Sequence, residues 1–200
     1  MHGLLQAMLY VSMLVETRPP LLWVQVLSQK GHGSAVVVDP RGYAVTCRHV
    51  VGDSQKATVW LKDGTALVAE VVAVDVVHDL ALLKVVGGEL RFLPRALAPE
   101  PARVGDTVWA RGHPKGLSHT LTKGVVSATG RTVVTGDGTV FPGVLQTDAA
   151  INPGNSGGEL LDVHGRLVGV PACIYEGAQG ISFAISVDRV RKFLDKHLPE

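Results

Sequence analysis

The segment Gly154-Asn155-Ser156-Gly157-Gly158 carries the chain's strongest signal, and its surroundings decide the fold. A serine hydroxyl is a weak nucleophile that needs a base within hydrogen-bond reach and amide donors for the oxyanion. Glycines on both sides permit the tight backbone that aims successive N–H groups into one small space. The same five residues also satisfy the G-x-S-x-G elbow of α/β-hydrolases. Taken alone, the segment fits two unrelated hydrolase folds or a plain glycine-rich hairpin.

The residues that follow the segment exclude the α/β-hydrolase interpretation, because that elbow requires a helix after the serine. Residues 159–170 instead read as two short strands joined by a turn at His164-Gly165. From residue 21 onward, short apolar runs are bounded by turn signals, and this spacing predicts an antiparallel barrel or sandwich. The expected strands are 21–27, 34–38, 43–47, 57–61, 65–74, 80–86, 107–110, 117–121, 124–128, 132–134, 144–147, 159–161, 166–170 and 180–185.

The strands fall into two halves separated by an irregular, proline-bearing stretch. One helix closes the chain over residues 187–198, where apolar side chains recur at three- and four-residue intervals and Ser186 is a suitable cap. The predicted divisions are an apolar, helical N-terminal extension over 1–20, a first β unit over 21–90, a connector over 91–106, a second β unit over 107–185 and the C-terminal helix over 186–200.

Composition predicts a globular chain without a polyanionic partner. Hydrophobic residues make up 46% of the chain, and its 19 basic and 18 acidic side chains leave a net charge of +1. No long-range field therefore favours nucleic acid or an anionic membrane. The first fifteen residues have no basic start and no small-residue cleavage site, and they are too short to span about 30 Å of hydrocarbon. We expect neither a signal peptide nor an integral membrane span here.

The two cysteines, Cys47 and Cys173, stand far apart and form no CxxC pair. Because a zinc site needs about four clustered soft or imidazole ligands, we expect no metal and no other cofactor. Two reduced, buried thiols are the favoured state, and a single disulfide remains an alternative.

A base and an acid precede Ser156 in the order histidine, aspartate, serine, which is the chymotrypsin-type order. His49 ends the run 43–51 and Asp79 heads the run 79–84, and strand ends combine rigidity with access to a cleft. We expect the other polar residues near these motifs to have no catalytic role. Asp75 and His78 should lie at the surface, Asp148 should anchor a loop, and the solvated histidines should be His113, His119 and His164.

These segments together resemble the trypsin-like protease domain of the HtrA (Deg) family, in register from about residue 20 to 198. We expect no C-terminal PDZ module of the kind that is common in the family. The chain has His113-Pro114 and Ser186 where relatives carry asparagine-proline and proline. The matching segments are Gly33-Ser34-Ala35, Thr46-Cys47-Arg48-His49-Val50-Val51, Asp79-Leu80-Ala81-Leu82-Leu83-Lys84, Lys123-Gly124-Val125-Val126-Ser127-Ala128, the run 146–160 around the serine, and Gly180-Ile181-Ser182-Phe183-Ala184-Ile185.

The resemblance implies an all-β fold: a chymotrypsin/trypsin-like pair of six-stranded antiparallel β-barrels with a C-terminal helix. It further implies a serine endopeptidase in which Ser156 attacks the scissile carbonyl, His49 is the general base and Asp79 orients the imidazole. The oxyanion hole would be formed by the amides of Gly154 and Ser156, with Asn155 shaping the loop between them. The implied substrate pocket consists of Ala149, Ala150, Ile151, Ile181, Ser182 and Phe183.

No carboxylate falls among those pocket positions, so we expect cleavage after Val, Ala, Leu or similar residues. The family implies unfolded or misfolded polypeptides as substrates, a homotrimeric assembly, and a periplasmic or secreted location, while the absence of leader features leaves a cytoplasmic location open. The rival hypothesis is a chaperone-like binding module that keeps the barrels and does not cleave.

Overall fold

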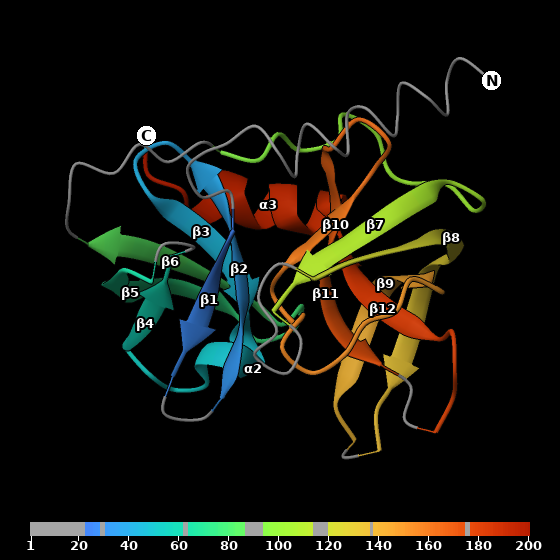
Figure 1. Cartoon of the computed structure of the whole chain (residues 1–200), viewed down its shortest axis with the longest axis horizontal. Helices are drawn as coiled ribbons and strands as arrows, with labels where there is room; N and C mark the ends of the chain where they lie inside the picture. Colours follow the sequence, from blue (N-terminus) through green and yellow to red (C-terminus); the bar gives the residue numbers. More distant parts are fainter. Residues whose placement is uncertain are drawn as a thin grey trace.

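Two closed antiparallel β-barrels of six strands each lie side by side in the computed structural model (Figure 1). The structure describes residues 23–28, 31–61, 64–86, 94–113, 120–136, 138–174 and 177–200, so the predicted N-terminal extension lies outside the described residues. The first barrel comprises β1 (Trp23–Leu27), β2 (His32–Asp39), β3 (Tyr43–Cys47), β4 (Lys56–Trp60), β5 (Ala66–Asp75) and β6 (Leu80–Val86), with the short helix α2 (Arg48–Val51) after β3. The second comprises β7 (Thr107–Gly112), β8 (Thr120–Val134), β9 (Val140–Thr147), β10 (Glu159–Leu161), β11 (Leu167–Ile174) and β12 (Ser182–Ser186).

The two barrels share one topology. Around the first barrel the order is β1-β2-β3-β6-β5-β4, and the second runs β7-β8-β9-β12-β11-β10, which is the same order in its own six strands. Each closes by pairing its first strand with its fourth, β1 with β4 and β7 with β10, and closure removes the free edges of the sheet. The prediction of an all-β double barrel is confirmed.

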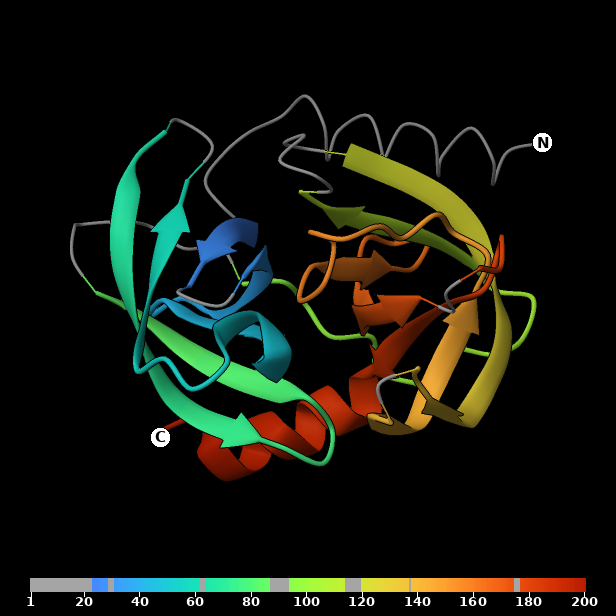
Figure 2. The same ribbon diagram turned by 90° about the horizontal axis from the view of Figure 1, so that it is seen from below.

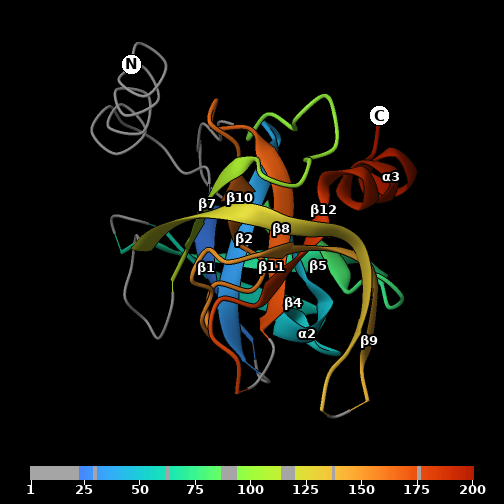
Figure 3. The same cartoon turned by 90° about the vertical axis from the view of Figure 1, so that its right-hand side faces the viewer.

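The long strand β8 differs from the sequence prediction, which divided this region into strands over 117–121, 124–128 and 132–134. A single strand of 15 residues runs from Thr120 to Val134 and bends from β7 to β9, as Figure 3 shows. Two glycines lie within this continuous strand. A Cβ at Gly124 would lie 2.3 Å from the amide of Ala149, and Gly130 takes a φ of +69° amid the register shifts of the β8–β9 ladder.

The closing helix α3 (Val187–His197) lies across both barrels (Figure 2). It contacts β11 and β12 of the second barrel and β6 of the first, and it buries Val187, Val190, Phe193 and Leu194. Ser186 occupies the N-cap position with extended backbone, but its side chain makes no capping hydrogen bond, so that detail of the prediction was wrong. Packing of the apolar face therefore holds this helix more than its cap does.

The connector between the barrels is hydrogen-bonded to both of them. The amide of Arg95 donates to the carbonyl of Val37 in β2 (2.8 Å), and the amide of Ala98 donates to the carbonyl of Leu167 in β11 (2.9 Å). Because these bonds fix an irregular segment from both sides, the connector helps to set the orientation of one barrel against the other.

The barrels approach each other closely at Gly157. A Cβ at this position would lie 2.1 Å from the Ser34 carbonyl oxygen and 2.3 Å from Thr46 Oγ1, both in the first barrel. The backbone φ of +82° also favours glycine. Only a residue without a side chain allows the second barrel to approach β2 and β3 this closely.

We predict that Gly157→Ala destabilises the protein more than Gly138→Ala does. The two glycines have nearly the same φ, +82° and +83°, but nothing lies within 4 Å of a Cβ at Gly138. The control should lose about 1–2 kcal/mol from the left-handed backbone alone, and Gly157→Ala should lose at least about 1–3 kcal/mol more from overpacking. Urea unfolding of both variants measures the difference, and equal losses would show that the contact is unimportant.

Candidate functional site

Pairing of β3 with β6 brings His49 beside Asp79. Cys47 at the end of β3 lies opposite Leu80 at the start of β6, so the residues just outside the ladder meet. The carboxylate of Asp79 accepts the backbone amide of His49 at Oδ1 (2.8 Å), and its Oδ2 lies 2.7 Å from His49 Nδ1. The two bonds orient the imidazole with Nδ1 toward the carboxylate and Nε2 away from it.

Asp79 takes a conformation that few residues adopt. Its φ is +56°, the only positive value at a non-glycine position in the part of the chain that the structure describes. Its carbonyl accepts the Arg48 amide (2.9 Å), so both its backbone and its side chain are bonded to the first turn of α2. Aspartate tolerates this left-handed region better than most residues do, and such outliers gather at functional sites.

The turn before Asp79 contains a second aspartate–histidine pair. Asp75 Oδ1 accepts the amides of Val77 (2.9 Å) and His78 (3.0 Å), and its Oδ2 lies 2.7 Å from His78 Nδ1. Both side chains are half-buried, where the sequence had suggested surface residues. The Asp75–His78 pair closes the turn that precedes Asp79. The His78 imidazole is bonded to Asp75.

The segment around Ser156 is fixed to the first barrel through Ser34. The Ser34 amide donates to the Ser156 carbonyl (2.8 Å), and its buried hydroxyl donates to the Gly154 carbonyl (2.8 Å) and accepts the His113 amide (3.1 Å). His113 is therefore buried, contrary to the expectation of a solvated side chain, whereas His164 is exposed as expected. His119 lies outside the described residues.

The Ser156 hydroxyl donates to the carbonyl oxygen of Ala172 in β11, at 3.2 Å. Among the described residues no hydrogen bond joins it to His49, although the sequence predicts that contact. Gly154 has a φ of +105°, and within the described chain its amide and that of Ser156 donate to no protein acceptor. The loop therefore keeps two backbone donors available next to the hydroxyl.

A buried ion pair anchors the strand that leaves this segment. Glu159 is fully buried at the start of β10, and its carboxylate accepts from Arg95 at 2.8 and 3.3 Å, with Arg111 at 3.7 Å. Arg95 also donates to the carbonyl of Gly165 (3.1 Å). Removing one partner of such a pair typically costs about 3–5 kcal/mol, so the connector helps to hold the serine segment in register.

Residues 33–170 match the family model described as a trypsin-like peptidase domain. A probable periplasmic serine endoprotease, DegP-like, from Brucella suis is 40% identical over 168 residues, which cover 82% of this chain and 32% of the relative. The chloroplastic Protease Do-like 1 of Arabidopsis thaliana is 40% identical over 173 residues, covering 84% of this chain and 39% of that protein. The chain belongs to the HtrA family of trypsin-like peptidases.

Solved structures agree with this assignment. The HtrA-type protease AlgW with a tripeptide matches with a TM-score of 0.79 and 35% identity, covering 94% of this chain and 64% of that one. The serine endoprotease of Yersinia pestis matches with a TM-score of 0.77 and 32% identity, covering 94% and 66%. The chain spans about a third of the length of the curated relatives from Brucella and the plant.

The predicted pocket residues of this HtrA-type chain come from two neighbouring segments. Ser182 of β12 pairs with Thr147 of β9, which brings the segment that starts at Ala149 near β12. Ala149 and Ile151 are buried in one apolar cluster. Phe183 is buried in a different apolar cluster, and Ile181 packs against the cluster that contains Phe183. Ala150 is exposed and Ser182 is buried. Asp148 accepts the Val125 amide (2.6 Å), which confirms it as a loop anchor.

Sequence reasoning missed Ala172, which accepts a hydrogen bond from Ser156, and Thr46, which bonds to Ser34 beside the serine segment. Ala172 acts through its carbonyl oxygen, which no residue type reveals. Thr46 is a fully buried hydroxyl in an otherwise apolar strand and donates to the Ser34 carbonyl (2.7 Å). A hydroxyl inside an apolar run was the available signal, because buried polar groups need a partner.

Both cysteines are free thiols beside the Asp79 carboxylate. Burial, followed by the negative charge of Asp79, raises the pKa of Cys47 well above its usual value. The same two causes raise the pKa of Cys173 to about 12. Cys47 Sγ donates to the carbonyl of Pro171 (3.2 Å), which agrees with a buried packing role.

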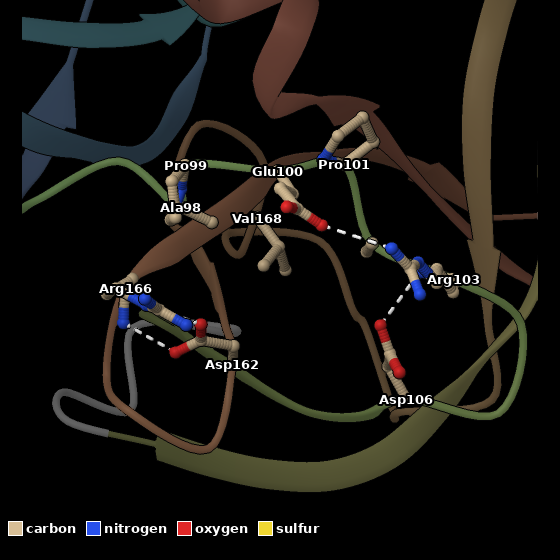
Figure 4. Close-up of a pocket in the computed structure, with 10 residues that line it drawn as sticks. Ala98, Pro99, Glu100, Pro101, Arg103, Asp106, Asp162, Arg166 and Val168 are labelled. Carbon is tan, nitrogen blue, oxygen red and sulfur yellow. Dashed lines mark hydrogen bonds and ion pairs between the residues drawn. The ribbon is translucent and has the colours of Figure 1, made fainter.

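A separate surface pocket lies between the connector and the β10–β11 turn (Figure 4). Its charges neutralise one another: Arg166 pairs with Asp162 (2.8 Å), and Arg103 pairs with Glu100 (3.1 Å) and donates its amide to Asp106 (2.7 Å). None of the predicted site residues lines this pocket.

No helix of the described residues is long and apolar enough to cross a membrane.

We predict that Cys173 is alkylated slowly in the folded protein and faster in Asp79→Asn. With a pKa of about 12, only about one thiol in ten thousand is ionised at pH 8, and the thiolate is the reactive form. Removing the negative charge of Asp79 lowers that pKa and raises the rate. Iodoacetamide labelling followed by peptide mapping measures it, with Asp188→Asn on α3 as the control. Equal rates in the two variants would exclude the electrostatic explanation.

Proposed function

We propose that this chain is a serine endopeptidase that hydrolyses peptide bonds through an acyl-enzyme, with Ser156, His49 and Asp79 as its triad. The observation that carries the proposal is that the Asp79 carboxylate accepts two hydrogen bonds from His49, one from Nδ1 and one from the backbone amide. A carboxylate in this position selects the tautomer whose Nε2 accepts a proton and stabilises the imidazolium that forms. The names of the relatives, serine endoprotease and HtrA-type protease, support the same activity.

In the proposed mechanism the Ser156 hydroxyl exchanges its bond to Ala172 for one to His49 Nε2. Nε2 takes the hydroxyl proton as Oγ attacks the carbonyl carbon, and it returns that proton to the leaving amine. Water then hydrolyses the ester by the same route, and the serine is regenerated. Contacts of this kind are often loose without substrate and tighten when it binds.

The unpaired amides of Gly154 and Ser156 would stabilise the oxyanion of the tetrahedral intermediate. Loss of one such donor typically costs about 10² to 10³ in rate. Asn155 is 1% exposed, and a Cβ at Gly112 would lie 2.7 Å from its Oδ1, so the side chain is packed tightly under the loop. This packing supports a role for Asn155 in shaping the loop that presents the two donors.

The proposed substrates are unfolded or misfolded polypeptides cut after small aliphatic residues. Ala149 and Ile151 contribute apolar surface next to the serine segment, and none of the proposed pocket residues is charged. A homotrimer is the proposed assembly. We propose an extracytoplasmic location, since the bacterial relatives are named periplasmic.

We predict that Ser156→Ala abolishes casein hydrolysis and that Asp79→Asn lowers kcat by about 10⁴. Ser127→Ala, at an exposed serine of β8, is the matched control and should retain full activity. Release of acid-soluble peptides over time measures the rate. Equal hydrolysis by the parent and Ser156→Ala would refute the mechanism, and binding of unfolded casein without cleavage by the parent would favour the binding-module hypothesis.

Selectivity provides a further prediction. Peptides with Val, Ala or Leu before the cleaved bond should be hydrolysed at least about 10-fold faster than those with Arg or Lys, because a buried cation without a partner is strongly disfavoured. Mass spectrometry of digests of a peptide library ranks the residues. A preference for Arg or Lys would contradict the proposed pocket.

A further inference from the structure

The structure places three side chains with metal-ligating atoms together at the base of the site. The Sγ of Cys47, a ring nitrogen of His49 and a carboxylate oxygen of Asp79 all lie within 4.8 Å of one another. They come from the end of β3, the first turn of α2 and the residue before β6, which the β3–β6 pairing joins. Sequence spacing gave no sign of this cluster, because Asp79 is 32 positions after Cys47.

We propose that Cys47, His49 and Asp79 bind a thiophilic divalent cation, with Zn²⁺ as the best fit, and that this binding blocks the nucleophilic function of the site. Thiolate, imidazole and carboxylate are the three ligand types that Zn²⁺ takes in proteins, and three protein ligands with one open position suit a tetrahedral ion with a bound water. The soft sulfur ligand favours Zn²⁺ over Mg²⁺ or Ca²⁺, which prefer oxygen.

The electrostatics of the cluster favour a cation. The carboxylate of Asp79 lies within 4.8 Å of the other two ligand atoms, and its negative charge attracts a positive ion. Apart from His49, no side-chain cation pairs with Asp79 among the described residues, so its charge is not already neutralised.

Access and space are compatible with binding. The His49 side chain is 44% exposed, whereas the Asp79 side chain is 10% exposed and Cys47 is buried. His49 Nδ1 and Asp79 Oδ2 are 2.7 Å apart, and nitrogen and oxygen ligands at about 2.0–2.1 Å from a tetrahedral ion require this gap to widen by about 0.7 Å. We expect rotation of the His49 ring, the most exposed of the three ligands, to open this gap.

Binding would inhibit through the histidine tautomer. Zn²⁺ takes the place of the proton on Nδ1, which moves to Nε2, and the Cys47 thiol releases its proton to solvent. An imidazole ligated at Nδ1 and protonated at Nε2 has no lone pair to accept the Ser156 proton. The inhibition rests on the proposed function, whereas the binding itself does not.

Binding is tested in the Ser156→Ala variant, which cannot digest itself under the proposed mechanism. Isothermal titration with ZnCl₂ should give one ion per chain, and Co²⁺ should give the thiolate-to-cobalt charge-transfer absorption that requires a cysteine ligand. Since losing even an outer partner typically costs about 10–100-fold in metal affinity, adding Cys47→Ala should weaken Zn²⁺ binding by about 100-fold or more. Adding Cys173→Ala instead should leave the affinity and the absorption band within about two-fold.

Two results would overturn the site: no charge-transfer band with Co²⁺, or Zn²⁺ affinity unchanged by Cys47→Ala. If Cys47→Ala does not fold, Cys47→Ser keeps the side-chain volume, and retention of the band in Cys173→Ala still assigns the ligand. In the parent chain, one equivalent of Zn²⁺ should stop casein hydrolysis and EDTA should restore it. Zn²⁺ bound at Cys47 in a parent that never cleaves casein would uphold the site and refute the proposed activity, and full hydrolysis with Zn²⁺ bound would refute the inhibition.

Discussion

The absence of a side chain at Gly157 is the constraint on which the rest of the site depends. Because nothing projects from this residue, the serine segment of the second barrel lies directly on β2 and β3 of the first. The hydroxyls of Ser34 and Thr46 fill the hydrogen-bonding needs of that contact from within the first barrel. One barrel supplies the histidine and the aspartate, the other supplies the serine, and the close approach at Gly157 lets the two meet.

Charge is distributed unequally around this contact. The Glu159 carboxylate behind the serine segment is matched by Arg95 and approached by Arg111, so it serves as a neutralised anchor. The Asp79 carboxylate is bonded to one histidine and leaves a negative potential that extends to two thiols. A matched charge fixes position, while an incompletely matched charge remains available to stabilise a positive ring or an ion.

The sequence predicted the architecture well, because strand alternation and turn residues are local signals that the barrels preserve. It could not predict that β8 is one bent strand, since glycines needed for close approach at Gly124 and for a bulge at Gly130 look the same as glycines in turns. The pairing of His49 with Asp79 was accessible through motif order. The contact of Ser156 with Ala172 was not accessible, because it is made through a backbone carbonyl that no residue type reveals. The burial of His113 was not accessible either, because its amide meets Ser34 of the first barrel only when the two barrels dock.

The cysteines illustrate the same limit in another way. Their spacing indicated no metal site, and each alone reads as a filler of the core. Only the three-dimensional register of β3 against β6 brings Cys47 to the His49–Asp79 pair. Ligand clusters formed across a sheet ladder leave no regular interval in the sequence.

The left-handed backbone of Asp79 places stability and activity in opposition at one residue. Glycine would adopt the same conformation without strain, and asparagine adopts it readily. Neither would supply the carboxylate that orients His49. A population selected for heat resistance alone would therefore be free to drift away from aspartate here, and only continued selection for turnover would retain it.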